Sequence, residues 1–458
     1  MELKGKKVLV VGLGKSGLAA ALFLRRQGAQ VTVSDIRSAE SLAKEIPALL
    51  DEGIMVEAGG HGLLTFRRQD LIVVSPGVPL DTPELVQARN FGRPVIGELE
   101  LAARFLKGKI LAITGSNGKT TTTALAGEIL KESGLPALVA GNIGVPVVDL
   151  IDESTEDTWS VLEVSSFQLE STEKFHAKIA VILNITPDHL DRHGTFENYA
   201  LAKERIFAAQ DASDFAVLNA DNPRTAEAAA RSHAPVFWFS AKHSVTQGAW
   251  VENGNVVYRS APGGAMETIL PIAKVSLKGE HNVENVLAAV CAARLAGVAA
   301  GVIARSIENF RAVEHRLEYV ETINGVDYYN DSKATNVDAT EKAVAAFPGG
   351  IHLILGGKDK GAPYSPLAPL LRERVRAVYT IGAAAAKIES ELRGVVTIHS
   401  CETLANAVDA AAKAARPGDV VLLAPACSSY DQFENYEQRG RVFKQLVSER
   451  REWKARNA

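Results

Sequence analysis

The chain has 458 residues, which is too long for one hydrophobic core, and we expect about two to four domains. Hydrophobic residues make up 47% and charged residues 23%, the balance of a globular protein. The net charge of −4 implies no large basic surface, which argues against a nucleic-acid partner. The three cysteines, Cys291, Cys401 and Cys427, form neither a zinc motif nor a disulfide framework, so we expect a reducing cytoplasm.

No membrane insertion is expected. The N-terminus passes directly into a predicted strand and does not have the pattern of a secretion signal. Residues 286–304 carry only one charge, Arg294, and we predict two alanine-rich core helices broken at Gly297. We expect a monomer.

The order of patterns predicts an α/β protein. Short valine-rich runs bounded by turn residues alternate with amphipathic stretches, as in parallel sheets with crossover helices. Residues 236–280 instead carry Asn-Gly turns between aromatic and β-branched residues, which predicts antiparallel strands. Boundaries near residues 97 and 312 divide the chain into segments 1–97, 98–312 and 313–458.

The first glycine-rich turn, "GLGKSG", contains Gly12, Gly14 and Gly17 between a predicted strand and helix. Asp35 ends the next predicted strand, about twenty residues further on, which is the spacing of a dinucleotide fingerprint. Three interpretations remain open: a nicotinamide or flavin site, a site for another diphosphate such as a UDP-sugar, and a tight structural turn.

The second turn lies in "ITGSNGKTTTT", again between a predicted strand and helix. Backbone N–H groups from Gly115 to Thr120 can hold β- and γ-phosphates, Lys119 can neutralise them, and Thr120 can hold Mg²⁺. The loop is two residues shorter than the usual phosphate-loop pattern, which argues against a standard motor protein or GTPase.

A magnesium nucleotide needs further oxygen ligands. Glu163 follows one predicted strand, and Asp188, His189, Asp191 and His193 follow another, at the edge where open α/β sheets bind ligands. A structural role remains the alternative for Glu163, and we interpret His193 as a surface histidine.

Three later segments carry polar side chains suited to a nucleotide, because asparagine can read a base and arginine can clamp a phosphate. The last of them could equally form a turn. The residues are His281, Asn282 and Asn285 in "GEHNVENV", Arg316 in "EHRLEYV", and Asp331, Lys333 and Thr335 in "YNDSKATN".

Together these segments resemble the ATP-dependent Mur ligase family. The segments that match the family in order are "GSNGKTTTT", "GNIG", "LEVSSFQLE", "PDHLDRHG", "YALAKERIF", "HNVEN", "EHRLE" and "NDSKATN". The segments similar to its D-glutamate-adding branch are "GLGKSG", "SPGVPLDTPEL", "PVIGELEL" and "LLAPACSSYDQFENYEQRG". The resemblance covers essentially the whole chain, and the short phosphate loop is then the variant found in this family.

The resemblance implies three domains: a Rossmann-like UDP-binding domain, a central P-loop ATPase domain with a mostly parallel sheet plus a small antiparallel sheet, and a Rossmann-like amino-acid-binding domain. It implies that the chain joins D-glutamate to UDP-N-acetylmuramoyl-L-alanine in peptidoglycan synthesis. The expected intermediates are an acyl phosphate and a tetrahedral adduct, and the expected cofactors are ATP and two Mg²⁺ ions.

The resemblance also implies roles for individual residues. Catalysis would involve Lys119, His189 and Lys203, and the metal ligands would be Thr120, Glu163, His189 and carbamylated Lys203. The ATP site would comprise Gly115, Ser116, Asn117, Gly118, Lys119, Thr120, Thr121, Asn282, Asn285, Arg316 and Asp331. The UDP-substrate site would comprise Gly14, Lys15, Ser16, Asp35, Arg37, Ser75, Gly77, Asn142, Ser165 and Gln168. The D-glutamate site would comprise Lys333, Thr335, Lys360, Ser429 and Tyr436.

Several alternatives stay open. From its own sequence context, Lys203 could be a helix-surface lysine paired with Glu204 or Asp211, and Lys358 competes with Lys360. Tyr436 stands where some members of the family have phenylalanine. Other activities to exclude are a related ligase with another acceptor, a nicotinamide dehydrogenase and a non-catalytic ATP-binding module.

Overall fold

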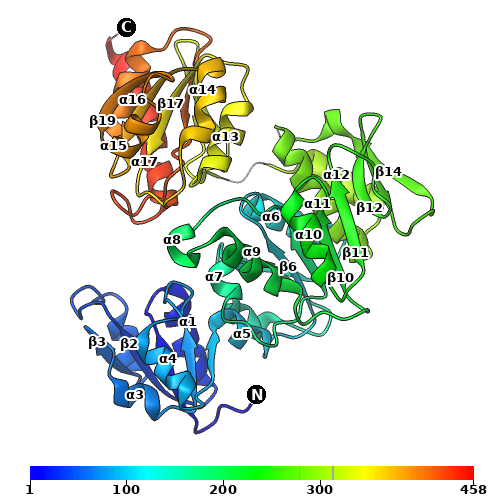
Figure 1. Ribbon diagram of the computed structural model, residues 1–458, viewed down its shortest axis with the longest axis vertical. Coiled ribbons are helices and arrows are strands. Elements are labelled where there is room, and N and C mark those ends of the chain that lie inside the picture. Colours follow the sequence, from blue (N-terminus) through cyan, green and yellow to red (C-terminus); the bar gives the residue numbers. More distant parts are fainter. Residues whose placement is uncertain (278, 312–313, 458) are drawn as a thin grey trace. The chain divides into compact units, whose positions relative to one another are not determined.

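The computed structural model describes residues 1–277, 279–311 and 314–457 (Figure 1). Its contacts divide the chain into two compact units. The first comprises residues 1–185, 200–274 and 284–307, and the second comprises residues 186–199, 275–283 and 308–458.

The N-terminal part of the first unit is a parallel sheet in the order β3-β2-β1-β4-β5, as the alternating pattern predicts. One side of its core consists of Leu9 and Val11 of β1 packed with Phe66 and Leu85. The strands are β1 (Lys7–Val11), β2 (Gln30–Asp35), β3 (Met55–Ala58), β4 (Leu71–Val74) and β5 (Val95–Gly97). The helices are α1 (Lys15–Arg26), α2 (Ile46–Asp51), α3 (Leu63–Arg67), α4 (Pro83–Asn90) and α5 (Glu98–Ala103).

The remainder of the first unit is built on a nine-stranded sheet in the order β14-β13-β12-β11-β10-β9-β6-β8-β7. The strands are β6 (Lys109–Thr114), β7 (Ala137–Gly141), β8 (Trp159–Glu163), β9 (Ile179–Ile182), β10 (Phe215–Asn219), β11 (Val236–Ser240), β12 (Gly248–Glu252), β13 (Asn255–Arg259) and β14 (Met266–Pro271). The helices between Lys119 and Asn309 are α6 (Lys119–Glu132), η1 (Val147–Glu153), α7 (Ser166–Leu169), α8 (Leu190–His193), α9 (Phe196–Glu204), η2 (Arg205–Phe207), α10 (Pro223–Ala228), η3 (Ala229–Arg231), η4 (Ile272–Lys274), α11 (Glu280–Leu295) and α12 (Ala300–Asn309).

The predicted antiparallel strands are present, and they extend the parallel sheet at its edge. Pairing is antiparallel only from β12 to β14, around the Asn253-Gly254 turn. Strand β11 lies inside the segment predicted to be antiparallel, but it pairs in parallel with both β10 and β12. Its three consecutive aromatic residues fit either direction, so the side-chain pattern alone did not distinguish them.

The second unit contains a six-stranded sheet in the order β15-β16-β20-β17-β18-β19, in which only β15 runs antiparallel to its neighbour. Helices α13 to α15 cover one face of the sheet, and α16 and α17 cover the other. The strands are β15 (Glu318–Ile323), β16 (Val326–Asn330), β17 (Ile351–Gly356), β18 (Val375–Ile381), β19 (Thr397–Glu402) and β20 (Val420–Leu423). The helices are α13 (Val337–Ala345), η5 (Ser365–Leu367), α14 (Ala368–Arg374), α15 (Ala385–Glu391), α16 (Leu404–Ala414) and α17 (Tyr436–Asn457).

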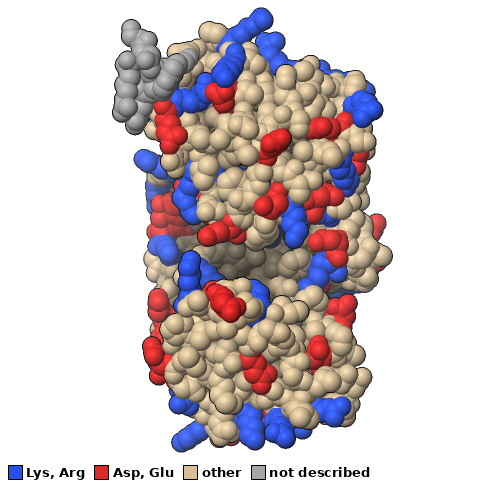
Figure 2. Space-filling view, turned by 90° about the vertical axis from the view of Figure 1, so that its left-hand side faces the viewer, with Lys and Arg blue, Asp and Glu red and all other residues tan. Residues whose placement is uncertain are grey.

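The fold can be compared with the expectations about the alanine-rich stretch, membrane-spanning helices and surface charge. The alanine-rich stretch forms α11 and α12, separated around Gly297 as predicted. Among the described residues, no helix is both long and apolar enough to cross a membrane. Acidic and basic side chains are intermixed on the face drawn in Figure 2, consistent with 50 Lys and Arg against 54 Asp and Glu.

Candidate active site

The phosphate loop connects β6 to α6, as its sequence predicts. Gly118 caps the helix with a φ of +84°, a left-handed conformation that glycine adopts without steric cost. A Cβ atom at this position would also lie 2.1 Å from Oδ1 of Asn285. The backbone N–H groups of Ser116 and Asn117 donate to the carbonyl oxygen and Oδ1 of Asn184, at 2.9 and 2.8 Å. Asn184 was not identified from the sequence, although only two residues separate it from the "PDH" motif.

Two lysines converge on this loop. The Lys119 ammonium donates to the carbonyl oxygens of Gly115 and Ser116, at 2.8 and 2.9 Å. The Lys203 ammonium donates to the same Gly115 oxygen at 2.9 Å, and only 1% of Lys203 is exposed. The interpretation of Lys203 as a surface lysine is therefore wrong, because this side of α9 faces the phosphate loop. Glu204, its suggested partner, forms ion pairs with Arg224 and Arg231.

Glu163, the last residue of β8, is fully buried beside the start of α6. Its Oε2 accepts a hydrogen bond from the Thr120 hydroxyl at 2.7 Å, and its Oε1 accepts one from the Asn142 side chain at 2.8 Å. The carboxylate and the hydroxyl are hard oxygen donors, the class of ligand that Mg²⁺ prefers. Two of the predicted metal ligands, Thr120 and Glu163, are thus in direct contact.

The first glycine-rich turn has the close packing that its motif predicts. A Cβ atom at Gly17 would lie 1.9 Å from the carbonyl oxygen of Gly12, so only glycine fits. The Ser75 hydroxyl donates to the same carbonyl oxygen at 2.6 Å. Gly14 and Lys15 are exposed at the start of α1, Ser16 is half-buried, and Gly77 is exposed after β4.

Asp35 and Arg37 hold this turn from the end of β2. Asp35 accepts a hydrogen bond from the backbone N–H of Leu13 at 2.6 Å, and Arg37 donates to the Leu13 carbonyl at 2.8 Å. Burial acts to raise the pKa of Asp35, but hydrogen bonds from Arg37 and Leu13 outweigh it and the pKa is lowered. The carboxylate is therefore kept ionised beside the turn.

The other residues predicted for the UDP-substrate site, Asn142, Ser165 and Gln168, follow strands β7 and β8. Lys15 donates a hydrogen bond to the carbonyl oxygen of Gly144, two residues beyond Asn142. Ser165 and Gln168 form a capping box at the start of α7, in which the Ser165 N–H donates to Gln168 Oε1 at 2.9 Å. Their side chains therefore have a local structural role in addition to any role in binding.

In the second unit, Asp331 follows β16 and is 7% exposed. Burial raises its pKa to about 7, and the positive charges of Arg316 and Lys333 oppose that shift. Burial also lowers the pKa of His281 to about 4, with a further contribution from Arg316. The charge of Arg316 thus acts on both groups, and all three side chains were assigned to a nucleotide site from the sequence.

The predicted amino-acid site contains two close pairs. Lys333 donates to the Tyr436 hydroxyl at 3.0 Å, and its ammonium lies 4.8 Å from the centre of the same ring. Lys360 donates to Thr335 Oγ1 at 3.4 Å and to Asp188 Oδ1 at 3.3 Å. The fifth predicted residue, Ser429, is buried. Lys358, the rival of Lys360, is exposed and pairs with Ser428 through its backbone.

His189 and His193 flank the short helix α8. His189 caps the helix in a left-handed conformation, with a φ of 53°, and its backbone N–H donates to Asp188 Oδ1 at 3.0 Å. His193 is only 8% exposed, and its ring lies 5.2 Å from that of Tyr199. The interpretation of His193 as a surface histidine is therefore wrong, since α8 turns this residue inward onto an aromatic neighbour.

Arg439 is a buried residue that the sequence analysis did not single out. It is 0% exposed, and burial lowers its pKa to about 10. Its guanidinium donates to the Ser332 carbonyl at 2.8 Å, the Ser332 hydroxyl at 3.0 Å and the Cys427 carbonyl at 3.1 Å. It thereby joins the start of α17 to the segments that carry Lys333 and Ser429. Its only sequence signal was a charge within the "NYEQRG" segment.

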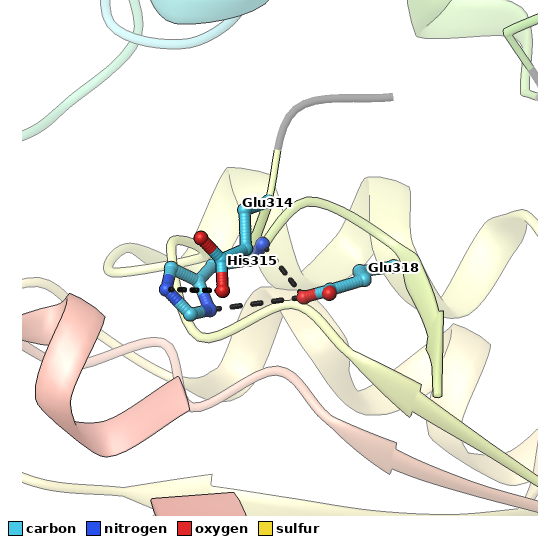
Figure 3. A group of neighbouring side chains, drawn as sticks. All are labelled: Glu314, His315 and Glu318. Carbon is cyan, nitrogen blue, oxygen red and sulfur yellow. Dashed lines mark hydrogen bonds and ion pairs between the residues drawn. The ribbon is translucent and has the colours of Figure 1, made fainter. Parts of the chain in front are cut away.

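One further group has the geometry of a metal site. Glu314, His315 and Glu318 place their ligand atoms within 4.8 Å of one another (Figure 3). The Lys444 ammonium, however, already contacts Glu314 and Glu318, at 2.5 and 2.9 Å. His315 is buried, and burial lowers its pKa. The two carboxylates are thus already paired with a side-chain ammonium, which indicates a structural role for this cluster.

Comparison with known proteins places these features in a family. Three family descriptions match the chain: the MurD-like N-terminal domain of Mur ligases at residues 6–97, the Mur ligase middle domain at residues 113–293, and the glutamate ligase domain of Mur ligases at residues 315–427. Together they account for most of the chain.

Curated relatives match over nearly the whole length. A protein of Acidobacterium capsulatum named UDP-N-acetylmuramoylalanine–D-glutamate ligase is 70% identical over 98% of this chain and 97% of its own. A protein of Koribacter versatilis with the same name is 62% identical over 98% of both. Among solved structures, the UDP-N-acetylmuramate–alanine ligase of Thermotoga maritima is 20% identical with a TM-score of 0.61, covering 97% of this chain and 99% of its own. That structure supports the fold alone.

Proposed function

We propose, from the premise that this chain belongs to the Mur ligase family, that it joins D-glutamate to UDP-N-acetylmuramoyl-L-alanine. Membership follows from the three matching domains and from relatives up to 70% identical over nearly the whole chain, and it makes the chain an ATP-dependent ligase of peptidoglycan synthesis. The observation that carries the choice of acceptor is the shared name of the two relatives above 60% identity.

We propose that each of the three segments binds a different substrate. Residues 1–97 bind the UDP moiety, residues 98–312 bind ATP, and residues 313–458 bind D-glutamate. We also propose that the protein is a cytoplasmic monomer. The cytoplasmic location is supported by the three cysteines, which are free and buried, because free thiols persist in a reducing compartment.

The chemical difficulty is that a carboxylate is a poor electrophile. In the proposed reaction, an oxygen of the L-alanyl carboxylate attacks the γ-phosphorus of ATP, and the bond from that phosphorus to the β-γ bridging oxygen breaks to release ADP. The D-glutamate amine then attacks the acyl carbon and loses a proton. The tetrahedral adduct collapses to the amide as inorganic phosphate leaves. Because several anions must meet, the protein contributes mainly positioning and charge neutralisation.

Lys119 and the backbone N–H groups of Gly115–Thr121 would hold the phosphates of ATP, since they form the strand–turn–helix at the end of β6. Asn282, Asn285, Arg316 and Asp331 would contact its adenine, phosphate and ribose. The contact between Asn285 and Gly118 supports this assignment, because it places one of these side chains against the phosphate loop.

The oxygen donors present fit magnesium. Thr120 and Glu163 would hold one ion, and His189 with carbamylated Lys203 would hold a second. Bound magnesium would neutralise phosphate charge during transfer. The hydrogen bond of 2.7 Å between Thr120 and Glu163 supports the first of these sites, because the two side chains are in direct contact.

Carbamylation of Lys203 is supported by its surroundings. An ammonium that is 99% buried is expensive to desolvate, and a second ammonium, that of Lys119, donates to the same carbonyl oxygen. The neutral amine can attack the carbon of CO₂ and release a proton, which gives an anionic carbamate. With ¹³C-labelled bicarbonate, a carbamate NMR signal should appear in the wild type and be missing in K203A. A signal of equal intensity in both proteins would exclude this site.

The substrate ends are assigned on similar grounds. Gly14, Lys15, Ser16, Asp35, Arg37, Ser75 and Gly77 would bind uridine diphosphate, and Asn142, Ser165 and Gln168 would contact the muramoyl part. Lys333, Thr335, Lys360, Ser429 and Tyr436 would bind D-glutamate, whose two carboxylates suit two lysines. The hydrogen bond from Lys360 to Thr335 favours Lys360 over the exposed Lys358.

The test is phosphate release from ATP with Mg²⁺ and UDP-N-acetylmuramoyl-L-alanine. D-glutamate, L-glutamate, L-alanine or no amino acid is added in separate reactions. Release that requires D-glutamate, with a product heavier by one glutamyl residue, is the expected result, and a K119A variant should abolish it. Release with another amino acid would change the acceptor. Tight NAD binding without ATP turnover would favour a dehydrogenase and overturn the proposal.

A further inference from the structure

Glu98, the first residue of α5, is a buried acid that the proposed reaction does not use. Only 1% of the residue is exposed. Its Oε1 accepts a hydrogen bond from the backbone N–H of Val148 at 2.9 Å, and the N–H of Val147 also acts on the carboxylate. Within the described part of the chain, its Oε2 is buried without a hydrogen-bond partner. Burying a carboxyl oxygen without a hydrogen-bond partner costs folding free energy, which indicates that Glu98 has a role that offsets this cost.

The two valines begin the short helix η1, and the carboxylate therefore caps the N-terminal end of this helix. The residues just before them form the loop 142–146, which follows β7. Glu98 therefore fixes the point at which this loop ends. Burial raises the pKa of Glu98 to about 7, the two backbone N–H groups lower it, and the charge of Asp149 raises it.

The other fixed points of the loop lie in the two proposed binding sites. Asn142 donates through its backbone N–H to the Glu163 carbonyl at 2.9 Å, and through its side chain to Glu163 Oε1 at 2.8 Å. Gly144 accepts a hydrogen bond from Lys15, at the start of α1. The loop is thus held by Glu163 next to the proposed ATP site, by Lys15 next to the proposed UDP site, and by Glu98 at its C-terminal end.

We propose that Glu98 is a positioning residue for the UDP-linked substrate, and that it acts by holding the loop 142–146 in register between the UDP turn and Glu163. The inference rests on the proposed function, which assigns Lys15 and Asn142 to that substrate. Glu98 acts on binding through this loop and does not touch the substrate itself. Its removal should weaken binding of the UDP substrate more than binding of D-glutamate.

The test compares E98M, which keeps the side-chain length but removes both acceptor oxygens, with E98Q, which keeps one. We expect E98M to raise the KM and the calorimetric Kd for UDP-N-acetylmuramoyl-L-alanine about tenfold, with the KM for D-glutamate within about twofold of the wild type. E98Q should stay within about threefold for both substrates, because its amide oxygen can still accept from Val148.

Glu100 on the same helix provides a matched control. It is equally buried, but its carboxylate accepts the backbone N–H groups of Lys174 and Phe175, away from the loop. E100Q should alter thermal stability without a selective change in the KM of the UDP substrate. If E98M does not fold, E98A is measured in the same way.

The outcomes separate this inference from the proposed function. An inactive wild type would refute the proposed function itself. If the wild type is active, the positioning role would be refuted by an E98M variant that changed both KM values equally or changed only the melting temperature. Impairment of E98Q as severe as that of E98M would also overturn it, since an acceptor would then not be what matters.

Discussion

Substitution of Gly118 by alanine adds only one methyl group, but we expect it to destabilise the phosphate loop strongly. The residue has a φ of +84°, and holding alanine in a left-handed conformation costs about 1–2 kcal/mol. The new Cβ would also lie 2.1 Å from Asn285 Oδ1, and such overpacking typically costs about 1–3 kcal/mol more. We therefore expect G118A to lower the free energy of unfolding by about 2–5 kcal/mol.

The same helix supplies the control. Gly134 lies just beyond the C-terminal end of α6 with a φ of +85°, and nothing lies within 4 Å of the position of its Cβ atom. G134A should therefore show the backbone strain alone, about 1–2 kcal/mol. The difference between the two variants measures the clash with Asn285, and N285A combined with G118A should recover that part but not the strain.

The assay is hydrogen exchange of the α6 amides, which reports local stability in a chain of several domains, together with titration of a fluorescent ATP analogue. If the loop takes up about 1.4 kcal/mol of the strain, G118A should bind the analogue about tenfold more weakly. G134A should bind it normally. Equal destabilisation in both variants, with normal nucleotide binding in G118A, would refute the reasoning.

Three other predictions follow from single contacts. K203A should reduce turnover about 100-fold while leaving most of the unfolding free energy intact, because the buried side chain contacts the phosphate loop. Phosphate release measures the turnover and thermal unfolding measures the stability. A normal rate would remove Lys203 from the mechanism. Y436F should raise the KM for D-glutamate about tenfold without changing that for the UDP substrate, since the hydrogen bond to Lys333 is lost. Burial lowers the pKa of His352 in the folded protein although Asp419 opposes it, so the unfolded state binds the proton more readily and stability should fall as the pH drops below about 6.5. Urea unfolding between pH 7.5 and 5.5 should show a weaker pH dependence in H352Q, and an unchanged slope would contradict the assignment.

Much of the fold could be predicted from the sequence, because its strongest signals are local. The two glycine-rich turns each sit between a strand and a helix, and the requirement for glycine at Gly17 and Gly118 comes from backbone atoms a few residues away or from the conformation itself. The direction of β11 could not be predicted in the same way. It pairs with the strands that precede and follow it in the chain, and its three consecutive aromatic residues suit both directions.

The contacts within the candidate site were less predictable, because they join residues distant in sequence. From its own sequence context a helix-surface position was one alternative for Lys203, and only the packing of α9 shows that its ammonium reaches Gly115, 88 residues earlier. Arg439 reaches Ser332 across 107 residues. A single sequence reports helical periodicity, but it does not report which element lies opposite a given helix face.

The same distinction explains where charge is buried in this protein. Local patterns place lysine, arginine and glutamate on helix surfaces, yet Lys203, Arg439 and Glu98 are each at most 1% exposed. All three direct their polar atoms at backbone groups of loops: Gly115, Cys427 and Val148. A buried charge costs free energy, and breaking its partnership costs more than replacing it. These three residues therefore fix the backbone beside the phosphate loop, before Ser429 and after Asn142, where proposed binding residues lie.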